Sequence, residues 1–158
     1  MTVRRRNKRI FVFGIFAVDI SFYVDKKVKP GETIIAKSSN IGPGGKASNQ
    51  AISARKLGGA TTLITRLGND NFNSYANSIW RKEKLSTSAK IDRTLPTGMA
   101  GIFIDDKTGE NSVIVHPGAS AQLGMNDFNS QKSKMQKGDI FLTPVSYTHL
   151  TLPTIALV

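Results

Sequence analysis

One glycine-rich stretch carries polar side chains at a spacing that suits a ligand site. Residues 41–51 read IGPGGKASNQA. Gly44 and Gly45 have no side chains, so their main-chain amides can come close to a bound molecule. Lys46 follows directly and Asn49 comes three residues later, which places both on the same side of a helix. We therefore expect a loop that leads into a helix and holds a polar ligand.

Two known phosphate-binding motifs fit this stretch poorly. A Walker A loop needs glycine at the position of Asn40 and serine or threonine at that of Ala47. The letters GPGGKA match the dinucleotide pattern G-x-G-x-x-A, but the next strand ends in TRLG, without an acidic residue to bind a ribose. A turn without a ligand would leave Lys46 and Asn49 without a role. A dinucleotide-dependent oxidoreductase stays open as an alternative function.

The composition restricts which other chemistry the chain can carry. Its 158 residues are enough for one domain with a substantial core, and they include no cysteine. Disulfides and thiolate metal sites are therefore excluded. His116 and His149 are its two imidazoles, too few to indicate zinc, and we expect no metal site.

The net charge of +11 suits an anionic partner. Much of it comes from an N-terminal arm with five basic residues, Arg4, Arg5, Arg6, Lys8 and Arg9. Such an arm can bind nucleic acid by releasing counterions from phosphates. No aromatic residue interleaves with it and no recognition helix follows, so we interpret residues 1–8 as a solvated extension and disfavour a nucleic-acid partner. A basic module that binds nucleic acid or another polyanion is the alternative.

Neither end of the chain has the pattern of a leader or a membrane anchor. The apolar run after the basic arm is short, contains Gly14 and ends at Asp19, so we expect no secretory leader, no membrane contact and a cytoplasmic protein. Residues 140–158 carry no charge, but two prolines leave too little continuous apolar length for a membrane span. We interpret residues 144–158 as foreign to the domain.

Short apolar runs predict strands with helices between them. Runs of buried type occupy residues 9–18, 61–68 and 138–143, and we expect them in one parallel sheet. Amphipathic runs form two hairpin-like pairs, near 20–41, with a strand at 33–41, and near 97–116. The alternation of strands and helices predicts an α/β fold in which helices cover a parallel sheet. The two amphipathic pairs would form a small accessory sheet.

Two helices are expected beside the strands. The first follows the glycine-rich stretch and ends at a glycine pair, and its apolar stripe consists of Ala47, Ala51, Ala54 and Leu57. The second is capped by Asp70, and its apolar face consists of Phe72, Tyr75, Ala76, Ile79 and Trp80. Each helix therefore has one face that can pack on the sheet.

The segment GGKASNQA at 44–51 resembles the N-terminal motif of the ribokinase (PfkB-type) family of carbohydrate kinases. Other segments agree with that family in order and spacing: FGIFAVD ending at Asp19, PGET at 30–33, TRLGNDNFN at 65–73, PTGMAGIFID at 96–105 and ENSVIVHPGAS at 110–120. The resemblance covers residues 9–143. It implies a ribokinase-like three-layer fold with helices on both faces of a parallel sheet and a small β lid, truncated at the C-terminal half. Residues 9–143 would be its N-terminal, sugar-binding part, with lid strands near 20–41 and 97–116.

The resemblance also implies a role for each residue of a sugar site. Asp19 would accept hydrogen bonds from sugar hydroxyls, and Asn49 would hold another hydroxyl. Gly44 and Gly45 would let the backbone approach the sugar. Lys46 would contact the sugar or offset charge near the phosphoryl acceptor.

Two departures from the family limit the implied activity. Ala17 stands where ribokinases usually carry asparagine, so one hydroxyl contact is lost or supplied by another residue, and the sugar stays unidentified. The family's catalytic base is an aspartate in a GAGD-type motif near the pocket for ATP and Mg²⁺, and no such motif occurs here. We therefore expect no catalytic residue and no ATP or Mg²⁺ element in this fragment. The expected function is the sugar-binding half of an ATP-dependent sugar kinase, inactive alone, whose full-length form would dimerise through its lid.

Overall fold

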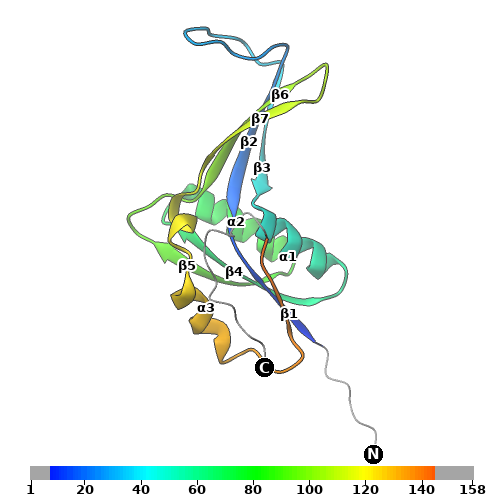
Figure 1. Cartoon of the computed structure of the whole chain (residues 1–158), viewed down its shortest axis with the longest axis vertical. Coiled ribbons are helices and arrows are strands. Elements are labelled where there is room, and N and C mark those ends of the chain that lie inside the picture. Colours follow the sequence, from blue (N-terminus) through cyan, green and yellow to red (C-terminus); the bar gives the residue numbers. More distant parts are fainter. Residues whose placement is uncertain (1–7, 145–158) are drawn as a thin grey trace, which may run out of the picture.

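The computed structural model describes residues 8–144 and is elongated, with a second sheet protruding from a body of helices and strands (Figure 1). The body contains a four-stranded parallel sheet in the order β5-β4-β1-β8. Its strands are β1 (Arg9–Phe13), β4 (Ala60–Gly68), β5 (Ser86–Asp92) and β8 (Ile140–Leu142). The basic side chains at positions 4–6 and the tail after Pro144 lie outside the described residues.

Helices cover both faces of the body sheet. They are α1 (Lys46–Lys56), α2 (Asn71–Lys82) and α3 (Met125–Lys132), with a short 3-10 helix η1 (Gly118–Gln122) before α3. Successive strand residues point to opposite faces. Val12 and Leu63 therefore pack with α1 and α2, whereas Phe11 and Ile64 pack with Phe128 of α3. This three-layer arrangement confirms the predicted fold class.

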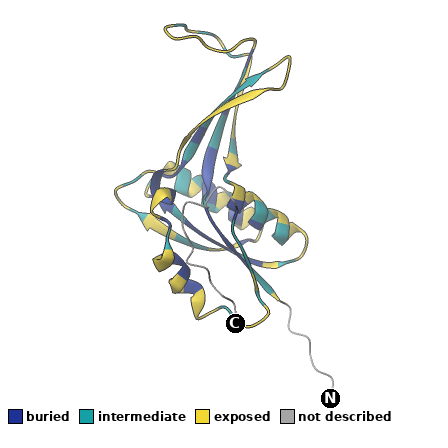
Figure 2. Ribbon diagram, in the orientation of Figure 1, coloured by how far each residue is buried: buried dark blue, intermediate teal, exposed yellow. Residues whose placement is uncertain are grey.

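The protruding second sheet has four strands in the order β3-β2-β6-β7. They are β2 (Ala17–Val24), β3 (Ser38–Gly44), β6 (Met99–Asp105) and β7 (Asn111–His116). The pairs β2–β3 and β6–β7 are antiparallel, and a parallel pairing of β2 with β6 joins them. Figure 2 shows the buried residues concentrated in the body and the exposed ones toward the tip of this sheet.

The predicted strand at residues 9–18 is two strands. The chain leaves β1 at Gly14 and starts β2 in the other sheet at Ala17. A side chain at Gly14 would place its Cβ 2.6 Å from the Cβ of Ala47, so the chain passes directly against the start of α1 at this point. Asp19 consequently lies inside the second strand and not at the end of the first.

The predicted strand at 33–41 is shorter than expected. β3 begins at Ser38, and residues 25–37 form a loop. Lys37 makes ion pairs of 2.7 Å with Asp25 and 2.8 Å with Asp106 in the β6–β7 turn. These ion pairs tie the end of the loop to the neighbouring hairpin.

The two predicted helices are present, with one error in the first. Leu57 does not belong to the apolar stripe of α1: its side chain is 89% exposed, because the helix ends at Lys56 and the chain turns at Gly58 with φ 89°. In α2 the predicted cap is confirmed, since the Asp70 carboxylate accepts a hydrogen bond from the main-chain N–H of Asn73. No helix within residues 8–144 combines the length and apolar character needed to cross a bilayer.

Candidate functional site

The candidate site lies where the second sheet joins the body. Asp19 on β2 stands opposite Gly42 of β3 and Ala100 of β6. Ala17, two residues earlier on the same face of β2, pairs with Gly44 at the end of β3. Asp19 is thus paired on both neighbouring strands with a residue that has a small side chain or none.

The Asp19 carboxylate has no partner of its own among residues 8–144. It is partly buried, and none of the hydrogen bonds or ion pairs of the described residues involves it. Burial raises its pKa above the ordinary aspartate value. The chain carries 22 lysines and arginines, yet none of those described neutralises this group. Asp19 is therefore a partly desolvated acceptor whose hydrogen-bonding capacity is free for a ligand.

At Gly44 and Gly45, other atoms of the protein occupy the space that a side chain would need. A Cβ at Gly44 would lie 2.1 Å from Oδ1 and 2.4 Å from Oδ2 of Asp19. A Cβ at Gly45 would lie 2.5 Å from the carbonyl oxygen of Ile15 and 2.8 Å from Cα of Phe16. Both glycines therefore permit close packing within the chain, and the predicted approach of their backbone to a sugar stays a prediction.

Lys46 and Asn49 lie on the first turn of α1, and both side chains are exposed. Gly45 occupies the N-cap with φ 87°, and its carbonyl accepts the first helical hydrogen bond, from Asn49 N. The helix has no capping side chain and no acidic residue in its first turn. Its positive end is therefore uncompensated by α1 itself and lies one residue after the glycine that touches Asp19.

Trp80 supports the site from inside the body, a role that sequence reasoning did not foresee beyond core packing. Its indole Nε1 donates to Ser48 Oγ of α1 at 3.2 Å. Its ring meets Phe16 edge-on at a centroid distance of 5.3 Å. Phe16 directly precedes β2, so one buried side chain fixes both the helix with Lys46 and the strand with Asp19.

A buried hydroxyl fixes the start of β6. Thr97 Oγ1 accepts from Gly68 N at 2.9 Å and donates to Asp70 Oδ1 at 2.8 Å. The carboxylate of Asp70 also accepts from the main-chain N–H groups of Thr97 and Asn73. Burial alone would raise the pKa of Asp70, but these hydrogen bonds lower it below the ordinary value. This hub of hydrogen bonds at Thr97 and Asp70 joins the end of β4, the start of α2 and the strand β6, which flanks Asp19.

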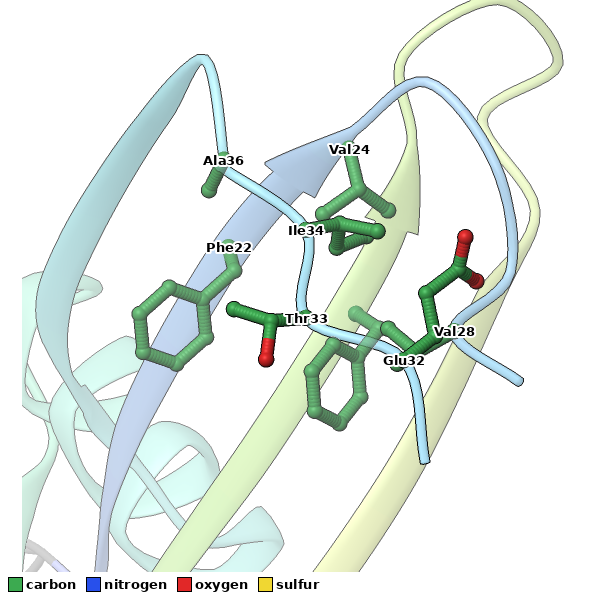
Figure 3. A pocket seen from close by; sticks show the side chains of 8 residues that line it. Phe22, Val24, Val28, Glu32, Thr33, Ile34 and Ala36 are labelled. Carbon is green, nitrogen blue, oxygen red and sulfur yellow. The ribbon is translucent and has the colours of Figure 1, made fainter. Parts of the chain in front are cut away.

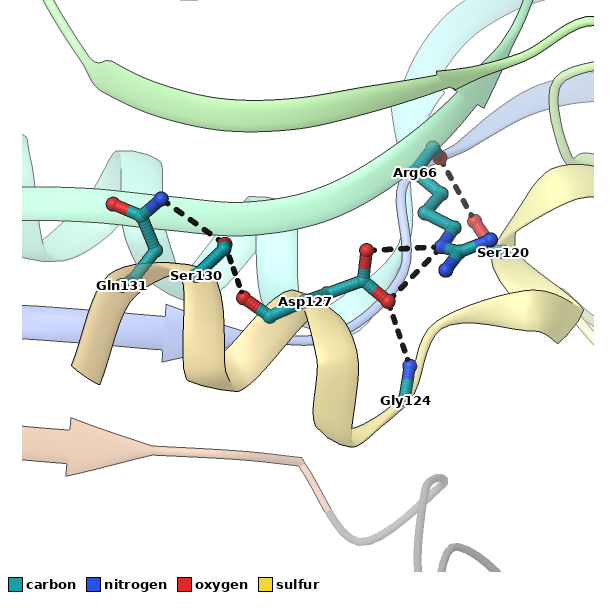
Figure 4. A network of polar contacts seen from close by, with 6 residues as sticks. All are labelled: Arg66, Ser120, Gly124, Asp127, Ser130 and Gln131. Carbon is teal, nitrogen blue, oxygen red and sulfur yellow. Dashed lines mark hydrogen bonds and ion pairs between the residues drawn. The ribbon is translucent and has the colours of Figure 1, made fainter.

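A second polar network lies on the opposite face of the body sheet, as Figure 4 shows. Arg66 Nε of β4 lies 3.1 and 3.0 Å from the two carboxylate oxygens of Asp127. Asp127 Oδ2 also accepts from Gly124 N at 2.9 Å, which caps the start of α3. Ser120 Oγ donates to the carbonyl of Arg66. This network fixes α3 and η1 to the sheet and is separate from Asp19.

An apolar cavity of about 430 Å³ lies on the second sheet (Figure 3). Phe22 of β2 and Phe103 of β6 stack at its floor with a centroid distance of 6.1 Å. Residues of the 25–37 loop, including Ile34, fold over them. Phe22 and Asp19 alternate to opposite faces of β2, so this cavity is not part of the Asp19 site.

The described residues do not fit ATP or Mg²⁺. Within residues 8–144, no three histidine, cysteine, aspartate or glutamate side chains gather closely enough to hold a metal ion. At the glycine-rich stretch, the Asp19 carboxylate occupies the place where a Cβ of Gly44 would stand, and a negative charge there disfavours a phosphate group. We therefore assign no contact with either group to these residues.

Comparison with known proteins finds similarity to ribokinases. The ribokinase of Dictyostelium discoideum is 34% identical over 134 residues, which are 84% of this chain and 42% of that protein. The deoxyribokinase of Salmonella typhi is 31% identical over 131 residues, 81% of this chain and 42% of that protein. The chain thus spans about two fifths of the length of these curated relatives.

Solved structures agree with the sequence relatives. The ribokinase of Giardia lamblia superposes with a TM-score of 0.74 at 27% identity, over 81% of this chain and 38% of that one. The ribokinase of Arabidopsis thaliana, complexed with ribose and ATP, gives 0.65 at 29% identity, over 72% and 37%. The model of the protein family described as "pfkB family carbohydrate kinase" matches residues 7–149. The chain therefore belongs to the pfkB family of carbohydrate kinases.

Proposed function

We propose that this chain is the sugar-binding part of a kinase that transfers phosphate from ATP to a sugar hydroxyl. The observation that carries the proposal is the Asp19 carboxylate, a partly buried acceptor without a donor among the described residues. A sugar hydroxyl supplies such a donor, and a hydrogen bond to a carboxylate is stronger than one between neutral groups.

Asp19, Lys46 and Asn49 together match the chemistry of a polyol. A hydroxyl group donates one proton and accepts others, so adjacent hydroxyls can donate to Asp19 and accept from the amide of Asn49 or the ammonium of Lys46. The uncompensated start of α1, which bears Lys46 and Asn49, adds a positive potential at its first turn. A site that pairs hydroxyls in this way rejects analogues that lack them.

The chemical step is assigned to the whole kinase and not to these residues. One relative was solved with ADP and another with ribose and ATP. In the whole protein, ATP with Mg²⁺ would supply the phosphoryl group. Within residues 8–144 no three candidate metal ligands gather, and we expect this stretch to bind and orient the sugar without phosphorylating it.

The second sheet would act as a lid and as the surface that pairs with a second copy. On its edge strand β7, Val113, Ile114 and Val115 are exposed in succession, so both faces of the strand are apolar. Exposed apolar patches of this kind mark interaction surfaces. Sedimentation of the chain should reveal a dimer that Ile114→Lys dissociates, whereas a monomer at all concentrations contradicts this pairing.

The alternative functions have less support. A dinucleotide site needs its glycine loop after a strand of the parallel sheet, but this loop follows β3, which is antiparallel to its neighbour in the second sheet. The net positive charge supports a polyanion-binding module. Against it, Arg9 of the basic arm is already ion-paired with Asp139 at 2.9 Å.

Isothermal titration of the chain with D-ribose, D-fructose, adenosine, NADH and random-sequence DNA distinguishes these functions. The proposal expects saturable binding of at least one of the first three. If the chain is folded by circular dichroism and binds none of them, the sugar-binding function is refuted. Binding of NADH or salt-sensitive binding of DNA alone would favour one of the alternatives.

A further inference from the structure

Gly44 and Gly45 are glycines for different physical reasons. Gly45 has φ 87°, a backbone conformation that residues with side chains rarely adopt. Gly44 is a strand residue whose φ is not positive, so its backbone does not require glycine. What excludes a side chain at Gly44 is the Asp19 carboxylate, whose Oδ1, Cγ and Oδ2 atoms would all lie within 2.4 Å of a Cβ there.

The same distances give the direction in which Asp19 leans. Its register partner on β3 is Gly42, but a Cβ at Gly42 would meet no atom closer than Asn40 Nδ2 at 3.5 Å. The carboxylate therefore lies diagonally across the strand pair, over Gly44 and away from Gly42. Gly44 immediately precedes the N-cap of α1, so this lean carries the carboxylate toward the helix that bears Lys46 and Asn49.

We propose that Gly44 is a positioning residue: the absence of its side chain lets the Asp19 carboxylate lie against β3 and lean toward the start of α1. This inference rests on the proposed sugar-binding function of Asp19. It assigns Gly44 a role that acts through the carboxylate, in place of direct contact between its backbone and the sugar.

A methyl group at Gly44 cannot avoid the carboxylate. Gly44 is buried, and its Cβ direction is fixed by the β3 backbone, so the flexible Asp19 side chain must move. The open space lies toward Gly42 and the solvent. The displaced carboxylate would be better hydrated and farther from α1, and its pKa would fall toward the ordinary aspartate value.

The test compares Gly44→Ala with Gly42→Ala, a matched control on the same strand and face that has room for a methyl group. D-ribose binding to the chain is measured by titration. Gly44→Ala should weaken binding about 10-fold or more, which is the loss expected for one misplaced charged hydrogen bond, whereas Gly42→Ala should stay within about 2-fold. In an Asp19→Ala background, Gly44→Ala should cause no further loss, because the group it displaces is gone.

Additive losses from Asp19→Ala and Gly44→Ala would overturn the inference and favour direct contact between Gly44 and the sugar. Wild-type affinity in Gly44→Ala would overturn it as well. If Gly44→Ala does not fold, Asp19→Ala/Gly44→Ala must fold, since a clash with another group would persist in that double variant.

A readout independent of the sugar separates failure of this inference from failure of the proposed function. Carboxyl ¹³C NMR gives the pKa of Asp19 in the unliganded chain, and Gly44→Ala should lower that pKa while Gly42→Ala leaves it unchanged. If no variant binds D-ribose, D-fructose or adenosine but this shift occurs, the sugar-binding function fails and the positioning role stands. An unmoved pKa in Gly44→Ala contradicts the positioning role.

Discussion

Replacing Asp127 by asparagine should destabilise the fold markedly, because it leaves a buried arginine without its counter-charge. The side chains of Arg66 and Asp127 are 13% and 4% exposed, so neither charge has full access to water. The carboxylate also caps α3 through Gly124 N. Asparagine keeps the shape and can still accept from Gly124, so the substitution removes mainly the negative charge.

The size of the effect follows from the geometry. Removing one partner of a buried ion pair typically costs about 3–5 kcal/mol. Here both carboxylate oxygens share the single Nε–H of Arg66 and the Arg66 side chain is 13% exposed, so the loss should be smaller, about 2–3 kcal/mol. For a chain of this size, that corresponds to a fall in Tm of roughly 4–12 °C.

Urea unfolding followed by Trp80 fluorescence measures this loss. The control is Glu110→Gln, which breaks the 3.9 Å ion pair between Lys27 and Glu110. Both of these side chains are more than 70% exposed, so this substitution should leave the unfolding midpoint unchanged. Asp127→Leu combined with Arg66→Met should be more stable than Asp127→Leu alone, since no charge is then left unpaired. Equal unfolding midpoints for Asp127→Asn and Glu110→Gln would refute the reasoning.

Two further substitutions test the contacts that hold the body together. Thr97→Val removes the acceptor of Gly68 N and a donor to Asp70, and should cost about 2 kcal/mol in urea unfolding, while Thr97→Ser retains both bonds and most of the stability. The main-chain N–H of Arg9 and then its guanidinium lower the pKa of Asp139 to about 2. Because this folded-state pKa lies below the unfolded value, Asp139 stabilises the fold above about pH 4 and loses that effect as the pH falls toward 2. Asp139→Asn should therefore flatten the pH dependence of the unfolding free energy between these values, and an unaltered profile would contradict the assignment.

Local signals in the sequence were sufficient to predict most helices and strands of the body. The apolar run at 61–68 formed a buried strand, and Asp70 capped α2 as its type and position indicate. The break at Gly14 was missed because the apolar run continues through it, and the close approach of Ala47, which lies 33 positions later, leaves no local signal. Leu57 was misplaced since helical spacing does not tell on which residue a helix ends.

The candidate site was only partly predictable for the same reason. Residue types and family resemblance singled out Asp19 and Gly44, but their mutual contact depends on the β2–β3 register. The hub at Thr97 and the pair between Arg66 and Asp127 join residues far apart in sequence, and no local pattern marks them. Such contacts are set by tertiary packing, which a single sequence does not display.

The most direct test of the central claim is the affinity of Asp19→Asn for D-ribose, measured by isothermal titration beside Asp105→Asn. Asp105 is a carboxylate on the same sheet, but it already accepts from the main-chain N–H groups of Lys107 and Thr108. If Asp19 is the free acceptor for a sugar hydroxyl, Asp19→Asn weakens binding about 10-fold or more and Asp105→Asn leaves it unchanged. Equal affinity in Asp19→Asn and the unmodified chain would contradict the claim.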